Sequence, residues 1–117
     1  NTPKGKRSSK GFHWEGNPDD TIHNMQFLGV AHRPDFAWHT DGIKIAVELK
    51  KGATGESIRN GLGQALVYAA SEDYDFVVYT FFDESENGRI KTAWKKPRET
   101  QFVASLWEHY NIRFQVV

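Results

Sequence analysis

The 117-residue sequence contains no cysteine. This absence excludes disulfides, thiolate metal sites and cysteine nucleophiles, and it favours a cytoplasmic location. The sequence also lacks an excess of charge of either sign, because 15 basic side chains balance 15 acidic ones. Any attraction for a polyanion must therefore come from local clusters of charge. No apolar run approaches the roughly 18 residues of a membrane span, so we expect no insertion into a membrane.

The residues that are present predict one folded domain. Hydrophobic residues make up 38% of the chain, charged residues 26% and aromatic residues 14%, which is the composition of a globular rather than a disordered protein. Residues 1–11 are polar, basic and without periodicity, and we expect a flexible basic arm there. Residues 12–117 are expected to form a single domain.

The order of the expected elements indicates an α/β fold. The patterns predict strands near 25–31, 33–39, 43–50 and 74–82, a helix over 56–71, a short edge strand over 89–94, a helix over 97–110 and a final strand over 112–117. Thr54 is the expected cap of the first helix, and the Thr-Asp-Gly sequence at 40–42 predicts a hairpin turn. This order predicts a mixed central sheet with helices on both of its faces.

The strand expected over 43–50 carries charge in an unusual place. Side chains alternate along a strand, so Ile43 and Val47 share one face while Ala46, Glu48 and Lys50 share the other. The aliphatic face is complete without the charged residues, and we expect it to enter the core. The face with Glu48 and Lys50 is then expected to line a wet cleft or a site of paired charges.

A second carboxylate is expected at the same place. Asp35 follows Pro34 on the preceding strand of the predicted hairpin, so its carboxylate can approach that of Glu48 across the strand pair. Two carboxylates repel each other, and a divalent cation relieves this repulsion. Mg²⁺ binds through one or two carboxylates while keeping several waters. Lys50 would then steer a water molecule or neutralise charge that develops on a phosphoryl oxygen.

These residues resemble the active-site signature of a known superfamily. The Pro34-Asp35 pair, a step of 13 residues and the Glu48-x-Lys50 pair look like the motif of the PD-(D/E)xK nucleases. Gln64 and Tyr68 lie one helical turn apart and resemble the Q-x-x-x-Y motif of the lambda-exonuclease-like and RecB-like branches. The resemblance implies a restriction-endonuclease-like (α)βββαβ core, here with an additional C-terminal helix and strand.

The resemblance also implies roles for individual residues. Asp35, Glu48 and the backbone carbonyl of Leu49 would bind Mg²⁺, for which Mn²⁺ would substitute, and Lys50 would be the catalytic lysine. Gln64 and Tyr68 would contact the substrate phosphate or order the site. The superfamily brings a further acidic residue from a helix ahead of the first strand. The corresponding region here does not read as a helix, and Glu15 is the best candidate, ahead of Asp19 and Asp20.

Other polar and aromatic residues allow more than one interpretation. Lys51 and Arg59, together with Lys10 and Trp38, are candidates for contact with a nucleic acid, although charge clusters are more often solvated surface. The five histidines show no pair at metal-ligand spacing on a helix and have no cysteine partners, so we expect them to be scattered on the surface. Of these, His32 and His39 are expected closest to the cleft.

The resulting expectation is a Mg²⁺-dependent nuclease that hydrolyses DNA phosphodiesters in repair or recombination, without a small-molecule cofactor. RNA remains open as the substrate, and a symmetric dimer is the simplest way to cut both strands of a duplex. The alternative is a catalytically degenerate module on the same fold that binds nucleic acid or serves assembly. The nuclease domain of a toxin or of a larger repair enzyme is a third interpretation, which a chain that opens on Asn1 rather than methionine permits.

Overall fold

The computed structural model describes the backbone of residues 11–14 and 25–117 and the side chains from residue 26 onward. The basic arm expected over 1–11 lies almost wholly outside these residues. The elements are β1 (Gly11–Trp14), β2 (Met25–Phe27), β3 (Val30–His32), β4 (Phe36–Thr40), β5 (Ile43–Gly52), α1 (Gly55–Ala70), β6 (Phe76–Asp83), the 3₁₀ turn η2 (Glu86–Gly88), α2 (Arg89–Trp94), α3 (Pro97–Tyr110) and β7 (Ile112–Val116).

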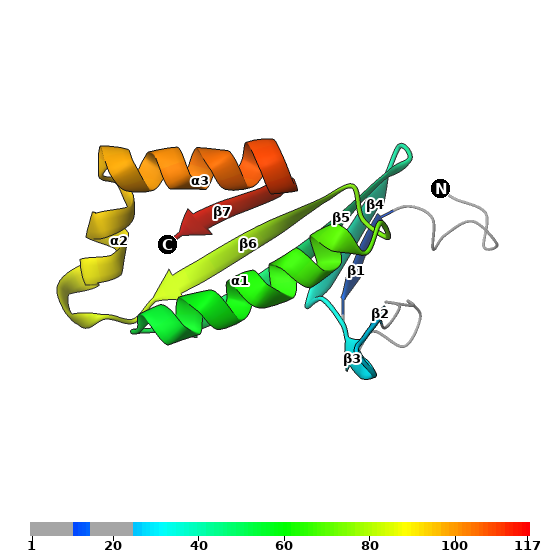
Figure 1. Cartoon of the computed structure of the whole chain (residues 1–117), viewed down its shortest axis with the longest axis horizontal. Helices are drawn as coiled ribbons and strands as arrows, with labels where there is room; N and C mark the ends of the chain where they lie inside the picture. Colours follow the sequence, from blue (N-terminus) through cyan, green and yellow to red (C-terminus); the bar gives the residue numbers. More distant parts are fainter. Residues whose placement is uncertain (1–10, 15–24) are drawn as a thin grey trace.

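Five strands form one mixed sheet in the order β1-β4-β5-β6-β7, and β2 and β3 form a separate hairpin (Figure 1). The β1–β4 and β4–β5 pairs are antiparallel, whereas β5–β6 and β6–β7 are parallel. The predicted turn joins β4 to β5, with Asp41 and Gly42 at positive φ angles. The expected α/β class with a mixed sheet is therefore confirmed.

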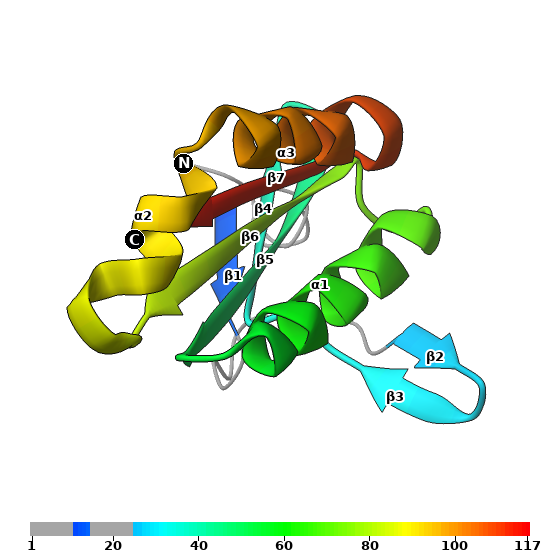
Figure 2. The same cartoon turned by 60° about the vertical axis from the view of Figure 1, so that its left-hand side comes forward.

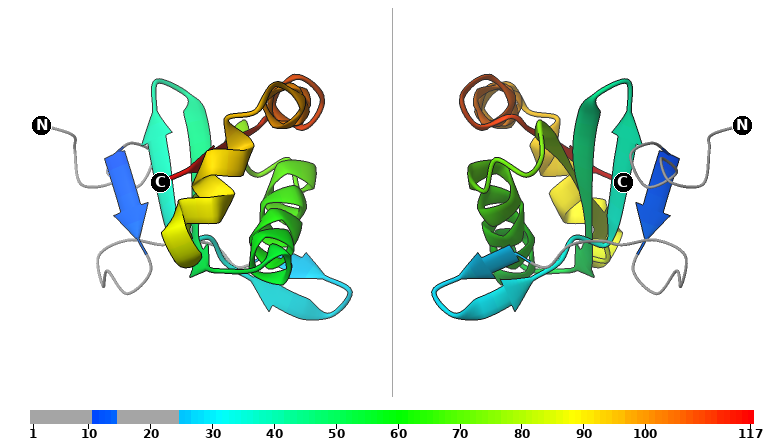
Figure 3. Two further views of the ribbon diagram at one scale, coloured as in Figure 1. Left: turned by 90° about the vertical axis from the view of Figure 1, so that its left-hand side faces the viewer. Right: turned by 90° about the vertical axis from the view of Figure 1, so that its right-hand side faces the viewer.

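The helices cover one face of the sheet, so the prediction of helices on both faces was wrong (Figure 3). Both α1 and α3 pack on the same core cluster, and α1 also contacts α3. The reason lies in the strand order. The chain passes from β5 through α1 to β6 and then through α3 to β7, always in the same direction across the sheet. Right-handed parallel crossovers in one direction place their helices on one face.

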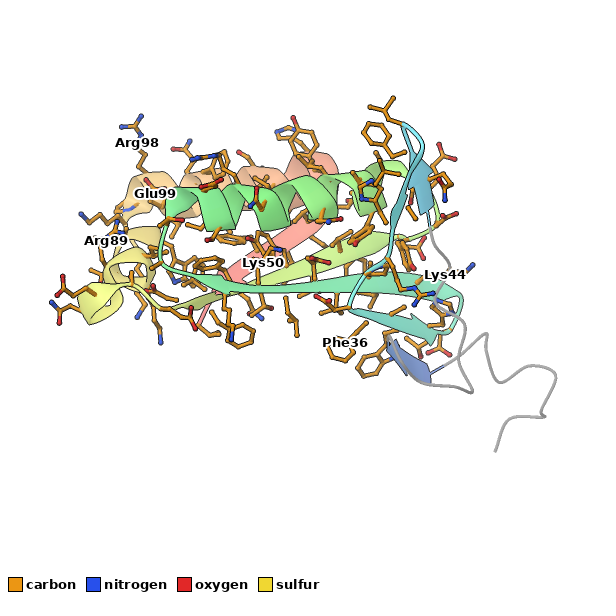
Figure 4. All side chains as sticks on the ribbon, turned by 90° about the horizontal axis from the view of Figure 1, so that it is seen from below. Phe36, Lys44, Lys50, Arg89, Arg98 and Glu99 are labelled. Carbon is orange, nitrogen blue, oxygen red and sulfur yellow. The ribbon has the colours of Figure 1, made fainter. Side chains whose placement is uncertain are left out.

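The covered face of β5 is the one that carries Glu48, which corrects the prediction that the aliphatic face enters the core. Ala46 is fully buried and Glu48 is 6% exposed, whereas Ile43, on the opposite face, is 42% exposed. Figure 4 shows Lys50 on the side of β5 that faces α1 and Phe36 on the other side of the sheet. The charged residues thus lie between β5 and α1, and the aliphatic residues line the open face.

The first helix forms where the local sequence predicts it. The Thr54 side chain accepts a hydrogen bond from the Ser57 N–H at 3.3 Å, so the expected N-cap is confirmed. Gly61, Ala65 and Tyr68 are the buried residues of α1. Two of these three residues are small, which lets α1 approach the sheet closely.

Two expected strands have a different structure. The strand expected near 25–31 is interrupted by a tight turn at Leu28 and Gly29, both at positive φ angles, and becomes the β2–β3 hairpin. The edge strand expected over 89–94 is the helix α2. Hydrogen bonds from the Ile90 N–H to Ser85 and from the Lys91 N–H to Asp83 fix its first turn, and buried Ile90 anchors it.

Among the described helices, none is long and apolar enough to cross a bilayer.

Candidate functional site

Asp35, Glu48 and Lys50 lie on one face of two adjacent strands. In the β4–β5 ladder Phe36 is paired with Val47, so Asp35, one residue before β4, lies opposite Glu48. The Asp35 carboxylate Oδ2 accepts a hydrogen bond of 2.8 Å from the Leu49 N–H. This bond holds the aspartate against β5 at the point where β4 begins.

The backbone of Leu49 supplies a further oxygen at this position. In a strand, the N–H and the C=O of one residue point toward the same neighbouring strand. The Leu49 N–H points to Asp35, so its carbonyl points to the same edge of β5. Two carboxylates and a backbone carbonyl are hard oxygen ligands, which is the donor set that Mg²⁺ prefers.

The helix α1 places Gln64 and Tyr68 over the carboxylates. The Tyr68 hydroxyl donates to the Gln64 Oε1 at 3.2 Å, and the Tyr68 side chain is 1% exposed. Burial raises the pKa of Tyr68 well above its ordinary value, and the negative charges of Glu48 and Asp35 raise it further. The Tyr68 hydroxyl therefore interacts electrostatically with both carboxylates, and it stays protonated at neutral pH. Burial, with a smaller contribution from Glu48, also raises the pKa of Tyr79.

We expect Tyr68→Phe to reduce the loss of stability in alkaline solution. The pKa of Tyr68 is raised in the folded protein above the value of 10.0 that applies when the chain is unfolded. Its contribution to stability is therefore complete below pH 10.0 and is lost above it, by about 1.4 kcal/mol per pH unit. Phenylalanine cannot ionise, so the variant should have a shallower decline in the free energy of unfolding between about pH 10 and 11.

Urea titrations followed by tryptophan fluorescence at several alkaline pH values measure this decline. Tyr110→Phe is the matched control, because the Tyr110 ring is 54% exposed. A Tyr68→Phe variant with the same alkaline slope as the wild type would show that Tyr68 ionises without hindrance in the folded protein.

His32 joins the site from the β2–β3 hairpin. Its Nδ1 lies 3.2 Å from the Gln64 Oε1, so Gln64 contacts both Tyr68 and His32. The sequence pattern predicted that His32 would be a surface histidine close to the cleft, and it indicated no contact with the site. The contact depends on the hairpin packing on α1, and the hairpin itself was not predicted. A histidine two residues before the Pro34-Asp35 motif was the available signal.

The remaining candidate residues lie in several places. Trp38 is 47% exposed on the open face of the sheet, opposite the face that carries Glu48. Lys51 is exposed at the end of β5 on the parity of that open face, and Arg59 is exposed on α1. Lys10 and Glu15 fall outside the described residues. Within residues 26–117, the sheet separates Trp38 from the cleft, and Lys51 has the parity of the same open face.

The described residues give a two-carboxylate site. Among them, no group of three or more His, Cys, Asp or Glu side chains is arranged to hold a metal ion. Asp35, Glu48 and the Leu49 carbonyl fit a Mg²⁺ ion in the chemistry of their donor atoms.

Comparisons of this chain with protein-family models, with curated proteins and with solved structures find no match.

Proposed function

We propose that the protein is a Mg²⁺-dependent nuclease with a restriction-endonuclease-like core that hydrolyses phosphodiester bonds in DNA. One observation carries this proposal: Asp35, Glu48 and Lys50 share the covered face of β4 and β5, beneath Gln64 and Tyr68 of α1. The five residues of the nuclease-like motif come from three separate segments of the chain. A structural ion pair would need only two of them.

Each group has a distinct chemical role in this proposal. Asp35, Glu48 and the Leu49 carbonyl would hold Mg²⁺, which lowers the pKa of an attacking water and offsets charge on the scissile phosphate. The Lys50 ammonium stabilises the negative charge that develops on the phosphoryl oxygens. The protonated Tyr68 hydroxyl orders Gln64, whose side-chain amide can donate hydrogen bonds to a phosphate oxygen.

The substrate and the setting are parts of the same proposal. DNA is the proposed substrate, and exposed Lys51 and Arg59 would contact its backbone without reading its sequence. Cleavage of both strands of a duplex would be most direct in a symmetric dimer. The proposed location is the cytoplasm, where DNA repair or recombination would use such an activity.

Incubation with linear, circular and branched DNA tests the function. We expect fragments in Mg²⁺ or Mn²⁺ from at least one substrate and none in EDTA. An RNA of the same sequence, run in parallel, decides between the two nucleic acids. Intact products with every substrate and both metals would contradict the nuclease proposal.

A second function is favoured by the two-carboxylate donor set. Many two-metal sites need more ligands than Asp35 and Glu48 supply, and no third acidic side chain joins them among residues 26–117. A catalytically degenerate module on the same fold would bind nucleic acid without cutting it. Salt-dependent binding in the absence of any cleavage would favour this module.

A further inference from the structure

The β2–β3 hairpin exposes apolar side chains beside the candidate site. It stands apart from the main sheet and lies against α1 (Figures 2 and 3). Phe27 is 53% exposed, Leu28 86% and Val30 55%. Leu28 also adopts a positive φ angle of 55°, which is uncommon for a residue other than glycine, asparagine or aspartate. Neither the turn geometry nor the packing of a core explains these apolar residues.

A groove of about 480 Å³ lies between part of this hairpin and α1. Cavities of this size class hold ligands the size of a nucleoside. None of the lining residues carries a charge, and two of them, Gln26 and Ser71, are polar. The lining consists of Gln26, Phe27, Leu66, Val67, Ala70 and Ser71. The groove is therefore suited to a flat, largely apolar group with hydrogen-bonding edges, and unsuited to a phosphate.

A chain of side-chain contacts links Phe27, which lines the groove, to the candidate site. The ring of Phe27 lies 6.3 Å from the ring of His32, centroid to centroid. His32 contacts Gln64, and Gln64 accepts the hydrogen bond of Tyr68, whose hydroxyl senses Glu48. Phe27 is thus connected to the carboxylates through His32, Gln64 and Tyr68.

We propose that this groove binds an unpaired nucleobase of the strand whose phosphate lies at Glu48. The inference rests on the proposed function. Phe27 offers an exposed aromatic face on which a base can stack, and the Gln26 amide offers a donor and an acceptor for the base edge. A base within a duplex is already stacked on both faces, so the groove selects single-stranded nucleic acid or the frayed end of a duplex.

Binding measured in EDTA tests the groove without any cleavage. The probe is a fluorescent single-stranded thymidine oligonucleotide of about ten nucleotides. We expect Phe27→Ala to weaken binding about tenfold, within the range that loss of one base–aromatic stack produces. Phe102→Ala is the matched control, because Phe102 is similarly exposed (56%) but lies on α3; its binding should change less than about twofold. Thermal unfolding confirms that both variants fold.

An oligonucleotide with abasic sites separates base stacking from contact with the backbone. Wild-type protein should bind the abasic strand more weakly than the thymidine strand, and Phe27→Ala should bind the two equally. Equal binding of Phe27→Ala and the wild type, equal losses in both aromatic variants, or no wild-type binding to single strands would overturn the groove proposal. Phe27-dependent binding without Mg²⁺-dependent cleavage would leave the groove in place and remove the nuclease. Cleavage without Phe27-dependent binding would do the reverse.

Discussion

Glu48→Gln is expected to abolish Mg²⁺-dependent cleavage, with a loss of about 10³-fold or more, while the protein stays folded. The Glu48 carboxylate is 6% exposed between β5 and α1, and it provides half of the charge that would hold the cation. Glutamine keeps the shape and can still accept a hydrogen bond, but it removes that charge. Burial of a neutral amide costs less than burial of a carboxylate, so thermal stability should not fall.

Lys50→Ala should reduce cleavage to a similar extent but leave Mn²⁺ binding intact. The Lys50 ammonium would stabilise negative charge on the phosphate, and it is not a ligand of the metal ion. Glu99 is an exposed residue of α3, and Glu99→Gln is the control for the loss of one carboxylate. The assays are single-turnover cleavage, isothermal titration with Mn²⁺ and thermal unfolding of each variant. Full cutting by Glu48→Gln or Lys50→Ala would show that the motif residues do not perform the chemistry.

Gly61→Ala should be the most destabilising single-methyl change in α1. A Cβ at position 61 would overlap the Tyr79 hydroxyl and ring, far inside van der Waals contact. The Tyr79 ring cannot retreat freely, because it is fully buried and its hydroxyl donates to the Ile58 carbonyl at 2.7 Å. Overpacking of this kind costs about 1–3 kcal/mol, and a broken buried hydrogen bond adds to the cost.

Gly63→Ala, in the same helix, is the matched control. A Cβ there would meet nothing within 4 Å, so the change should stabilise the protein by up to about 1 kcal/mol through helix propensity alone. Urea unfolding of the two variants gives free energies of opposite sign relative to the wild type. Equal effects in both variants would mean that α1 does not pack on Tyr79 as described.

Elements set by local chemistry were predictable. The Thr54 cap and the turn at 40–42 each depend on a few adjacent residues. The six residues of α2 were mistaken for a strand, because so short a segment carries no clear period. Contacts from the preceding loop decide its structure.

The covered face of β5 could not be predicted from alternation. The alternation of side chains along a strand shows which residues share a face, but it does not show which face the helices cover. That depends on the order β5-β6-β7, which is a non-local property. Leu62 and Ala65 pack on the core, but the close approach at Gly61 depends on Tyr79, 18 residues further along.

The candidate site was predictable only in part, because some of its contacts follow from strand alternation and others depend on non-local packing. Side-chain parity on β5 and the hairpin register together place Asp35, Glu48 and Lys50 on one face, as the structure has them. The contact of His32 with Gln64 requires the β2–β3 hairpin to pack on α1, and the Leu28-Gly29 turn lacks the residues that usually predict a hairpin.

A crystal structure of the protein soaked with Mn²⁺ tests the central claim most directly. The account predicts an anomalous peak about 2.0–2.3 Å from carboxylate oxygens of both Asp35 and Glu48, with the Leu49 carbonyl as a further ligand. Lys50 should lie beside the ion without touching it. A well-occupied Mn²⁺ elsewhere, or an Asp35 carboxylate turned away from Glu48 at saturating metal, would contradict it.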